Sequence, residues 1–272
     1  GVLNRIADQD ATVAAAVRRA LPEVARAVDL ALERWRRGGR IVLFGAGTSG
    51  RLATLDAAEL IPTYGTPPER YVARIAGGRE ALWRPVEGAE DDRAAGAGAA
   101  GDLTANDLAF GIAASGRTTW VIAALDEARR RGAATVGLAC VARPLLAAAC
   151  DVVIALETGR EAVAGSTRMK AGTAQKMVLN AFSTALMVRL GKVYRNLMVD
   201  VQATNEKLRR RALRLVMEST GADDGAAAGA LAAAGGSVKL AIAMLRLGLD
   251  AAEAARRLEQ ADGHLAGALG ER

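Results

Sequence analysis

The stretch GAGTSGRLATLDAAE, residues 45–59, joins a glycine-rich turn to a helical pattern. It follows IVLF at residues 41–44, a short apolar run that is typical of a buried parallel strand. Glycines let the backbone approach an anion closely, the side chains of Thr48 and Ser49 add hydroxyl groups, and the N-terminus of the following helix carries partial positive charge. This strand-turn-helix unit therefore predicts a phosphate site built from Gly47, Thr48 and Ser49.

The helical part of the same stretch carries a candidate catalytic carboxylate. Leu52, Leu55 and Glu59 are spaced at i, i+3 and i+7, which predicts one helical face that looks back toward the turn. A dinucleotide is the weaker candidate for the ligand, because no acidic residue ends a second strand about twenty residues further on. A small phosphate compound next to a carboxylate fits the stretch better.

A second strand-turn-helix unit repeats this arrangement. The apolar run of residues 108–113 leads into a turn that contains Ser115, Gly116 and Thr118, and a helical pattern follows. Capping of the helix is the simplest role for these hydroxyl groups, but two such units indicate a shared anion site at the carboxyl edge of a parallel sheet. Further strands are predicted at residues 71–78, 134–140 and 151–156. This alternation of strands and helices predicts an α/β fold with an open, doubly wound parallel sheet flanked by helices.

Three other segments complete the prediction. Cations and hydroxyls at Ser166, Arg168 and Lys170 precede a long apolar helix at residues 171–190, and they are either anion ligands or a cap with ordinary surface charges. The acidic segment of residues 79–101 is either a solvated face or the source of a carboxylate that faces the ligand. After a helix at residues 205–221, glycines divide the tail into short helices. We therefore predict a sheet domain over residues 1–215 and a small all-helical domain over residues 216–272.

Composition argues against several classes of function. The 272 residues carry a net charge of +6 and only 3% are aromatic, so the stacking platforms of a single-strand nucleic-acid binder are missing. Cys140 and Cys150 have no metal-type spacing, which argues against a structural zinc and for a reducing compartment. The sequence shows neither a signal-peptide pattern nor an apolar run of membrane length. We expect a cytoplasmic protein with no nucleic-acid or membrane partner.

Six blocks of the sequence closely resemble the N-acetylmuramic acid 6-phosphate etherases, which are bacterial enzymes of peptidoglycan recycling with a sugar isomerase (SIS) fold. In chain order the blocks are GAGTSGRLATLDAAE, IAGG, VEGAEDD, GIAASGRT, GSTRMKAGTAQKMVLN and NLMVDVQATNEKL. The resemblance extends over nearly the whole chain. The blocks are highly specific together, whereas GAGTSGR alone would indicate only the wider sugar-phosphate fold. The helices after residue 216 resemble the small C-terminal domain of the etherases, which is similar to ubiquitin-associated three-helix folds.

The resemblance implies cleavage of the D-lactyl ether of N-acetylmuramic acid 6-phosphate by elimination and hydration, which gives N-acetylglucosamine 6-phosphate and D-lactate without a metal or organic cofactor. By motif matching, Glu59 of DAAE and Glu90 of VEGAE are the acid/base residues. We assign Glu59 as the acid that protonates departing lactate and Glu90 as the base at carbon 2. The family also implies a homodimer.

The remaining predicted site residues bind the sugar phosphate. The phosphate is assigned to Ser49, Ser115 and Thr118, supported by Thr48 and by the backbone of Gly47 and Gly116. The sugar or the lactyl carboxylate is assigned, at second rank, to Ser166, Arg168 and Lys170. Two other functions stay open: an SIS-type aldose-ketose isomerase, which would share the phosphate turns and the base at carbon 2, and a non-catalytic SIS-type sugar-phosphate regulator. The presence of both glutamates favours an enzyme.

Overall fold

The computed structural model describes residues 1–203 and 205–271. Thr204 of the sixth block and the last residue of the predicted helical domain therefore lie outside the described residues. By its contacts the chain divides into two units, one of residues 1–58 and 68–184 and the other of residues 59–67 and 185–272. The boundary expected between residues 215 and 216 falls inside α8 (Glu206–Thr220). The division at that point into a catalytic and a small helical domain stays a prediction.

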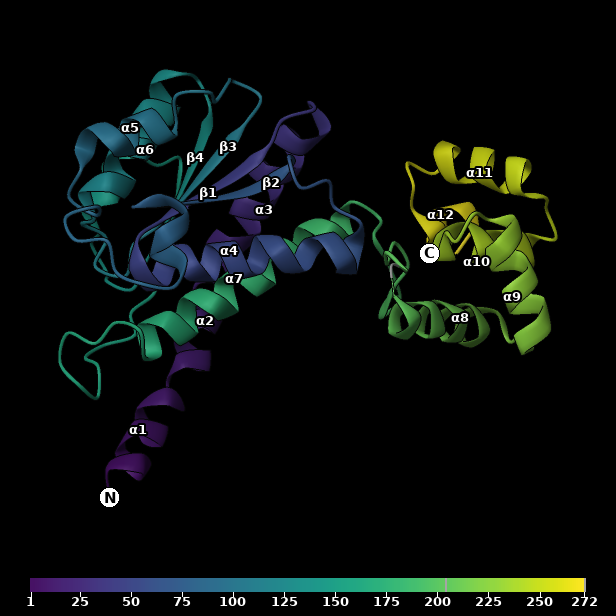
Figure 1. Ribbon diagram of the computed structural model, residues 1–272, viewed down its shortest axis with the longest axis horizontal. Coiled ribbons are helices and arrows are strands. Elements are labelled where there is room, and N and C mark those ends of the chain that lie inside the picture. The colour runs from purple at the N-terminus through teal and green to yellow at the C-terminus, as the bar shows by residue number, and fades with distance from the viewer. Residues whose placement is uncertain (204, 272) are drawn as a thin grey trace. The chain divides into compact units, whose positions relative to one another are not determined.

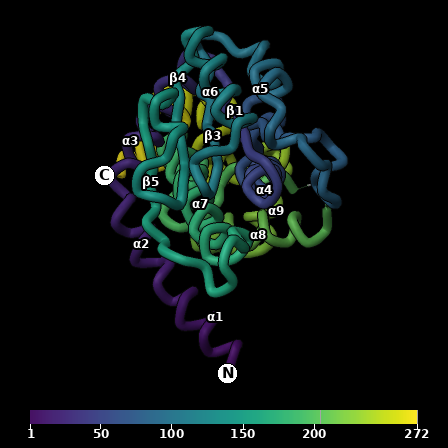
Figure 2. Tube along the Cα trace, turned by 90° about the vertical axis from the view of Figure 1, so that its left-hand side faces the viewer, coloured from purple at the N-terminus to yellow at the C-terminus, as the bar shows by residue number. Residues whose placement is uncertain are grey.

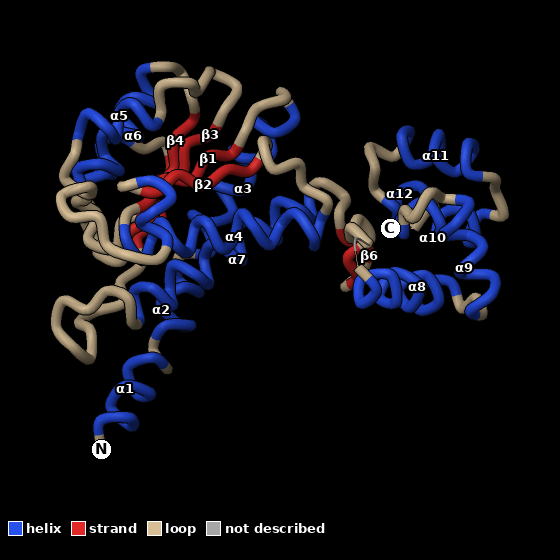
Figure 3. Tube along the Cα trace, in the orientation of Figure 1, coloured by secondary structure: helices blue, strands red, loops and turns tan. Residues whose placement is uncertain are grey.

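A five-stranded parallel sheet forms the centre of the first unit (Figures 1 and 3). In the strand order β2-β1-β3-β4-β5, β1 lies between β2 and β3. The glycine turn follows β1, so the sheet extends to both sides of the strand that leads into this turn. This arrangement confirms the predicted α/β fold. The strands are β1 (Ile41–Gly45), β2 (Tyr71–Ile75), β3 (Leu108–Ile112), β4 (Ala134–Ala139) and β5 (Val152–Ala155).

Helices cover both faces of this sheet because its central strands are apolar on both sides. On one face, Phe44 of β1 packs against Trp120 of α6, with ring centroids 6.0 Å apart. On the other face, Phe110 of β3 packs against Phe182 of α7, with centroids 4.9 Å apart. The helical segments between the strands and after them are α4 (Gly47–Tyr64), the 3-10 turn η1 (Gly78–Leu82), α5 (Arg93–Ala99), α6 (Thr119–Arg130), the 3-10 turn η2 (Leu145–Ala149) and α7 (Lys170–Arg189).

The N-terminal segment forms three helices where the sequence pattern predicts two. α1 (Val2–Asp10) and α2 (Val13–Arg19) are separated by a turn that the apolar spacing does not reveal. The apolar spacing of residues 8–37 predicts two helices split at Pro22. Pro22 lies in the first turn of α3 (Leu21–Arg36), where its missing N–H group is tolerated, so a helix boundary beside this proline is confirmed. No residue of α1 is buried, and the helix extends away from the sheet (Figure 2).

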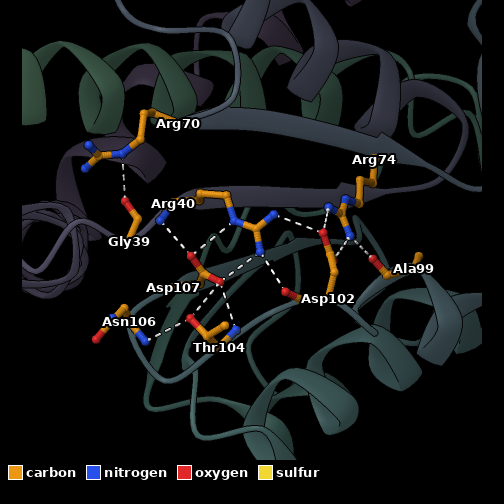
Figure 4. Close-up of polar contacts among 9 residues, drawn as sticks. All are labelled: Gly39, Arg40, Arg70, Arg74, Ala99, Asp102, Thr104, Asn106 and Asp107. Atoms are coloured by element: carbon orange, nitrogen blue, oxygen red, sulfur yellow. Dashed lines mark hydrogen bonds and ion pairs between the residues drawn. The ribbon is translucent and has the colours of Figure 1, made fainter.

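A network of charges ties the strands together at the amino edge of the sheet (Figure 4). Arg40 directly precedes β1 and Asp107 directly precedes β3, and the Nη2 of Arg40 lies 2.9 Å from the Oδ2 of Asp107. Asp102 accepts hydrogen bonds from Arg40 and from Arg74 of β2. Burial by itself raises the pKa of Asp107, but the hydrogen bonds from Arg40 and Thr104 outweigh it and hold the pKa below its ordinary value. Arg40 and Asp107 lie at the amino edge, opposite the carboxyl ends of the strands, whereas Arg74 is the fourth residue of β2 and reaches Asp102 from further along the sheet. The network thus connects β1 and β2 with the segment that leads into β3.

In its described residues the second unit contains a short antiparallel hairpin and the helices from α8 onward, packed around an apolar core of its own. Asp250 with Glu253 three residues later has the spacing of a capping box, which predicts an N-cap at Asp250. This cap is confirmed, since the Asp250 carboxylate accepts a hydrogen bond from the Glu253 N–H at 2.8 Å. Among the described residues no single helix is long and apolar enough to span a membrane, although α9 and α10 pass that test as a pair bent by 115°. After α8 and the hairpin strands β6 (Val193–Tyr194) and β7 (Leu197–Met198) the helices are α9 (Asp224–Ala233), α10 (Val238–Leu247), α11 (Ala251–Gln260) and α12 (Leu265–Ala268).

Candidate active site

The glycine turn brings the N-terminus of α4 directly to the carboxyl end of β1. A Cβ atom on Gly45 would lie 2.6 Å from the backbone N of Gly50, and one on Gly50 would lie 2.5 Å from the Cγ1 of Ile75. Neither position accepts a side chain without a shift of the backbone or of the neighbouring strand. The two glycines therefore permit the close approach that puts the helix N-terminus at the edge of the sheet.

A cavity of about 310 Å³ lies beside this turn. Its volume is at the lower end of the range for small-molecule sites, about 300–1,000 Å³. Both Gly47 of the predicted phosphate turn and Glu90, the predicted base, line it, so the acidic segment and the turn border the same space. The lining residues are Ala46, Gly47, Arg51, Ala76, Ala81 and residues 85–91.

Two backbone anchors hold the acidic segment against the cavity. The Nε of Arg51 donates hydrogen bonds to the carbonyl oxygens of Ala81 and Leu82, both at 3.0 Å. The carbonyl oxygen of Glu90 accepts a hydrogen bond from the N–H of Trp120 at 3.0 Å, which fixes the backbone of Glu90 next to the start of α6. The side chain of Glu90 itself is exposed, so it is free to meet a ligand.

Glu59, the predicted acid, lies on α4 within the second unit and is exposed. Within the described part of the chain it is not among the residues that line the cavity with Glu90. Leu55, on the predicted face of α4, is 49% exposed, so the apolar spacing does not mark the buried side of this helix. The buried positions of the helix are shifted by one residue and include Asp56.

Asp56 takes an inner position because two hydroxyl groups reach it. The Tyr71 hydroxyl donates to Oδ2 at 2.8 Å, and the Ser183 hydroxyl donates to Oδ1 at 3.0 Å. Burial raises the pKa of Asp56 to about 6, although both hydrogen bonds and the charge of Lys176 oppose the rise. A pattern of apolar residues could not reveal a buried carboxylate whose partners come from a strand and a distant helix.

The predicted phosphate ligands of α4 meet the start of α7. Ser49 is 7% exposed, and its Oγ donates a hydrogen bond to the Oε1 of Gln175 at 2.9 Å. A Cβ atom on Gly172 would lie 3.4 Å from the Cγ2 of Thr48, so the first turns of the two helices are packed together. Gln175 was missed from the sequence. Its only signal is a polar residue on the apolar side of a helix.

The second turn, which follows β3, also lies at the carboxyl edge of the sheet. Ser115 is exposed and its Oγ accepts a hydrogen bond from the N–H of Arg117 at 3.2 Å. Gly116 has φ +66°, and a Cβ atom there would lie 2.3 Å from the Cβ of Pro144, so a side chain is excluded. Thr118 occupies the N-cap position of α6, but its hydroxyl makes no capping hydrogen bond. The capping role considered for this hydroxyl is therefore wrong, and a ligand role is left open.

The third group of predicted residues precedes α7. Ser166 is half-buried and Arg168 is exposed. Lys170 is only 3% exposed, and its Nζ donates a hydrogen bond to the Oε1 of Gln9 in α1 at 2.7 Å. The backbone N–H of Lys170 is bonded to the carboxylate of Glu161 at 3.0 Å. The structure thus separates two surface candidates from one buried cation.

The chemistry of the site does not involve a reactive thiol. Burial raises the pKa of Cys140 and that of Cys150 to about 12, so both thiols are protonated near neutral pH and are poor nucleophiles. Among the described residues no group of three or more His, Cys, Asp or Glu side chains could hold a metal ion. The carboxylates, hydroxyl groups and helix N-termini remain as the groups that can bind an anion and move protons.

Known proteins share the fold and much of the sequence of this chain. Residues 23–129 match the glucokinase regulatory protein N-terminal SIS domain, and residues 85–185 match the SIS domain. The N-acetylmuramic acid 6-phosphate etherase of Symbiobacterium thermophilum is 59% identical over 245 residues, which are 90% of this chain and 82% of the relative. The etherase of Deinococcus radiodurans is 54% identical over 272 residues, 99% of this chain and 89% of the relative.

Solved structures show the same fold at low identity. A putative sugar-phosphate isomerase from Listeria monocytogenes has a TM-score of 0.50 at 18% identity, and the match covers 69% of this chain and 90% of that chain. A putative phosphosugar isomerase from Clostridium difficile 630 has a TM-score of 0.51 at 12% identity, and the match covers 81% of this chain and 56% of that chain. The structural likeness concerns the fold, whereas the sequence identity extends over nearly the whole chain. The chain belongs to the N-acetylmuramic acid 6-phosphate etherase family.

Proposed function

We propose that this chain cleaves the D-lactyl ether of N-acetylmuramic acid 6-phosphate to give N-acetylglucosamine 6-phosphate and D-lactate, a reaction of peptidoglycan recycling. The observation that carries the proposal is the cavity in which the phosphate turn at Gly47 and the acidic segment at Glu90 meet. A phosphate anchored at a helix N-terminus places the sugar next to a base, which is the arrangement that an elimination at carbons 2 and 3 requires.

The phosphate is bound at the carboxyl edge of the sheet. Ser49 and Thr48 lie in the first turn of α4, while Ser115 and Thr118 lie between β3 and α6. The unused hydroxyl of Thr118 and the exposed backbone of Gly47 supply donors at two helix N-termini. Gly116 allows the second turn to pass close to Pro144. No metal or organic cofactor is needed for this mode of binding.

The reaction proceeds through the open-chain aldehyde of the sugar. Glu90 removes the proton on carbon 2, which the neighbouring aldehyde makes acidic. The bond between carbon 3 and the ether oxygen then breaks, and Glu59 protonates the departing lactate. Addition of water to the resulting carbon–carbon double bond restores a hydroxyl group at carbon 3. Two carboxyl groups in different surroundings can divide these proton transfers; the exposure of Glu90 in the cavity supports its part as the base.

The sugar and the lactyl carboxylate have cationic and hydroxyl candidates before α7. Arg168 and Ser166 are accessible for direct contact. Lys170 reaches a carboxylate only if its hydrogen bond to Gln9 is exchanged. We further propose a cytoplasmic homodimer, as the family implies, in which these residues contribute to a neighbouring site. Sedimentation as a monomer at micromolar concentration would refute the dimer.

The function is tested with N-acetylmuramic acid 6-phosphate in deuterated water, following lactate release and deuterium at carbon 2. The wild-type chain should release lactate and incorporate deuterium. Glu90→Gln should abolish both, whereas Glu59→Gln should stop lactate release but leave exchange at carbon 2. Glu87→Gln is the matched control, because Glu87 is a carboxylate of the same cavity with no assigned proton transfer.

The outcomes separate the competing functions. Tight binding of the substrate without lactate release would overturn the etherase and favour a sugar-phosphate regulator. Conversion of an aldose phosphate that has a hydroxyl group at carbon 2 to the ketose, without lactate release from N-acetylmuramic acid 6-phosphate, would favour an isomerase. Loss of carbon 2 exchange in Glu59→Gln would reverse the assignment of the two glutamates.

A further inference from the structure

Gln175 is a buried amide with one half of its hydrogen bonding unmet. The side chain is 1% exposed, and its Oε1 accepts the hydroxyl hydrogen of Ser49 at 2.9 Å. Its Nε2 has no hydrogen-bond partner among the described residues. A buried N–H group without a partner costs free energy and is rare in native proteins. Gln175 belongs to α7, and its partner Ser49 lies in the first turn of the 18-residue helix α4. An unpaired buried N–H group beside a predicted phosphate site calls for an explanation.

The present orientation of the amide also conflicts with the role proposed for Ser49. A serine hydroxyl has one hydrogen to donate and two lone pairs. While that hydrogen points to Gln175, Ser49 can offer an anion only lone pairs, which repel it. An anion at the α4 N-terminus gains from this hydroxyl only if Gln175 stops accepting its hydrogen.

Rotation of the amide by 180° about its terminal bond resolves both problems. Nε2 then takes the place of Oε1 and donates to the Ser49 oxygen, so the unpaired N–H group finds a partner. The reversal deprives the hydroxyl hydrogen of Ser49, which is only 7% exposed, of its acceptor. A bound anion replaces that acceptor, so the reversed orientation is favoured when the anion is present. We propose that Gln175 is a positioning residue of the phosphate site, whose amide reverses when an anion binds and thereby directs the Ser49 hydroxyl to it.

The surroundings of Gln175 allow this reversal without a change of charge. Its other neighbour is the thiol of Cys140. Burial raises the pKa of this thiol to about 12, and the nearby Gln175 amide opposes the rise, although the contact does not reach hydrogen-bond geometry. The thiol is therefore neutral and can act as a weak donor to the reversed oxygen. In the described structure the thiol donates to the carbonyl oxygen of Ala171 at 3.6 Å, a long contact that can be exchanged. The inference rests on the proposed phosphate role of Ser49, and on no other part of the proposed function.

The first test is the affinity for inorganic phosphate, measured by calorimetry in a double-mutant cycle. Gln175→Met keeps the length of the side chain but cannot donate, and it should weaken phosphate binding about 3- to 10-fold, the range for one neutral hydrogen bond. In a Ser49→Ala background the same replacement should have almost no effect. Ser219→Ala is the control, since it removes a buried hydrogen bond on α8, which takes no part in the contact between α4 and α7, and it should leave the phosphate affinity unchanged.

The second test observes the amide in the unmodified protein. The chain has four glutamines, and with ¹⁵N-glutamine labelling the Nε2 signals of Gln175 are identified by their loss in Gln175→Met. Saturation with phosphate should shift one of its amide protons downfield and slow its exchange with water. A merely structural glutamine would keep its signals and give additive effects in the cycle.

The outcomes also distinguish this inference from the etherase reaction. Unchanged or tighter phosphate binding by Gln175→Met, or amide signals that stay in place at saturation, overturn the positioning role even if the wild-type chain releases lactate. Absence of lactate release overturns the etherase, while the phosphate titration still decides whether Gln175 directs Ser49. If Ser49→Ala leaves the affinity for phosphate unchanged, both the assignment of Ser49 to the phosphate site and the inference are refuted.

Discussion

Asp56 predicts an unusual dependence of stability on pH. Its carboxylate is 8% exposed, and burial raises its pKa from 3.8 to about 6. In the unfolded chain the carboxyl group loses its proton near pH 4, but in the folded protein it holds the proton until about pH 6. Between these values the folded state binds more protons, so this group's contribution to stability falls as the pH rises.

The size of the effect follows from the difference between the two pKa values. A rise from 3.8 to about 6 corresponds to about 3 kcal/mol at about 1.4 kcal/mol per pKa unit. The contribution is fully favourable below about pH 4 and lost above about pH 6. Asp56→Asn cannot titrate, and an amide can still accept from one hydroxyl and donate to the other. Relative to the wild type, the variant should therefore gain about 3 kcal/mol between pH 4 and pH 7.5.

Urea unfolding at a series of pH values measures this difference. Trp35, Trp83 and Trp120 all belong to the first unit, so tryptophan fluorescence follows the unit that contains Asp56. Tyr71→Phe is the companion variant: it removes a donor to the carboxylate and should steepen the loss of stability with pH. If the unfolding free energies of wild type and Asp56→Asn stay parallel from pH 4 to pH 7.5, the argument from burial is wrong.

Three further predictions concern the sheet, the thiols and the second turn. Asp107→Ala should destabilise the first unit by about 3–5 kcal/mol, because it leaves Arg40 without its buried partner. Asp102→Ala removes a carboxylate that is 54% exposed, so it should cost less than about 1 kcal/mol in the same urea titration. Equal losses of stability in the two variants would contradict this ranking. Both thiols, with pKa values of about 12, should react with iodoacetamide at pH 8 far more slowly in the folded than in the urea-unfolded protein, and similar rates would show that they are not buried. Gly116→Ala should lower the melting temperature and weaken phosphate binding, since its Cβ would lie 2.3 Å from that of Pro144; an unchanged melting temperature would show that the turn can shift.

Local patterns predicted most of the first unit because its elements are specified by their own residues. The strand before the glycine turn is a continuous apolar run, buried throughout, and Gly45 and Gly50 allow the next helix to begin directly at its end. The family motif, rather than any local pattern, predicted Glu90 as a ligand-facing residue. The amino-edge network around Asp107 was not predicted, because its partners lie 67 and 3 residues away in the sequence and no periodicity relates them.

Errors arose where a polar side chain occupies an inner position. The apolar spacing on α4 favoured the face of Leu55, yet the buried position belongs to Asp56. A carboxylate is buried only when other segments supply donors, and the donors here are Tyr71 of β2 and Ser183 of α7. Gln175 escaped notice for the same reason. Its partner Ser49 lies 126 residues away, so only the folded chain reveals the pair.

The buried polar residues Asp56 and Gln175 together explain how the phosphate turn is held in place. α7 contacts α4 through Gln175 with Ser49 and through Ser183 with Asp56. The contacts are seven residues apart on α4 and eight apart on α7, about 10 Å and 12 Å along the helix axes. Two hydrogen bonds at nearly equal spacing prevent α4 from sliding or turning on α7 without breaking both. The register of the two helices thus fixes the position of Ser49 at the edge of the sheet. The Gln175 amide can still rotate there, and this rotation presents the Ser49 hydroxyl to the anion.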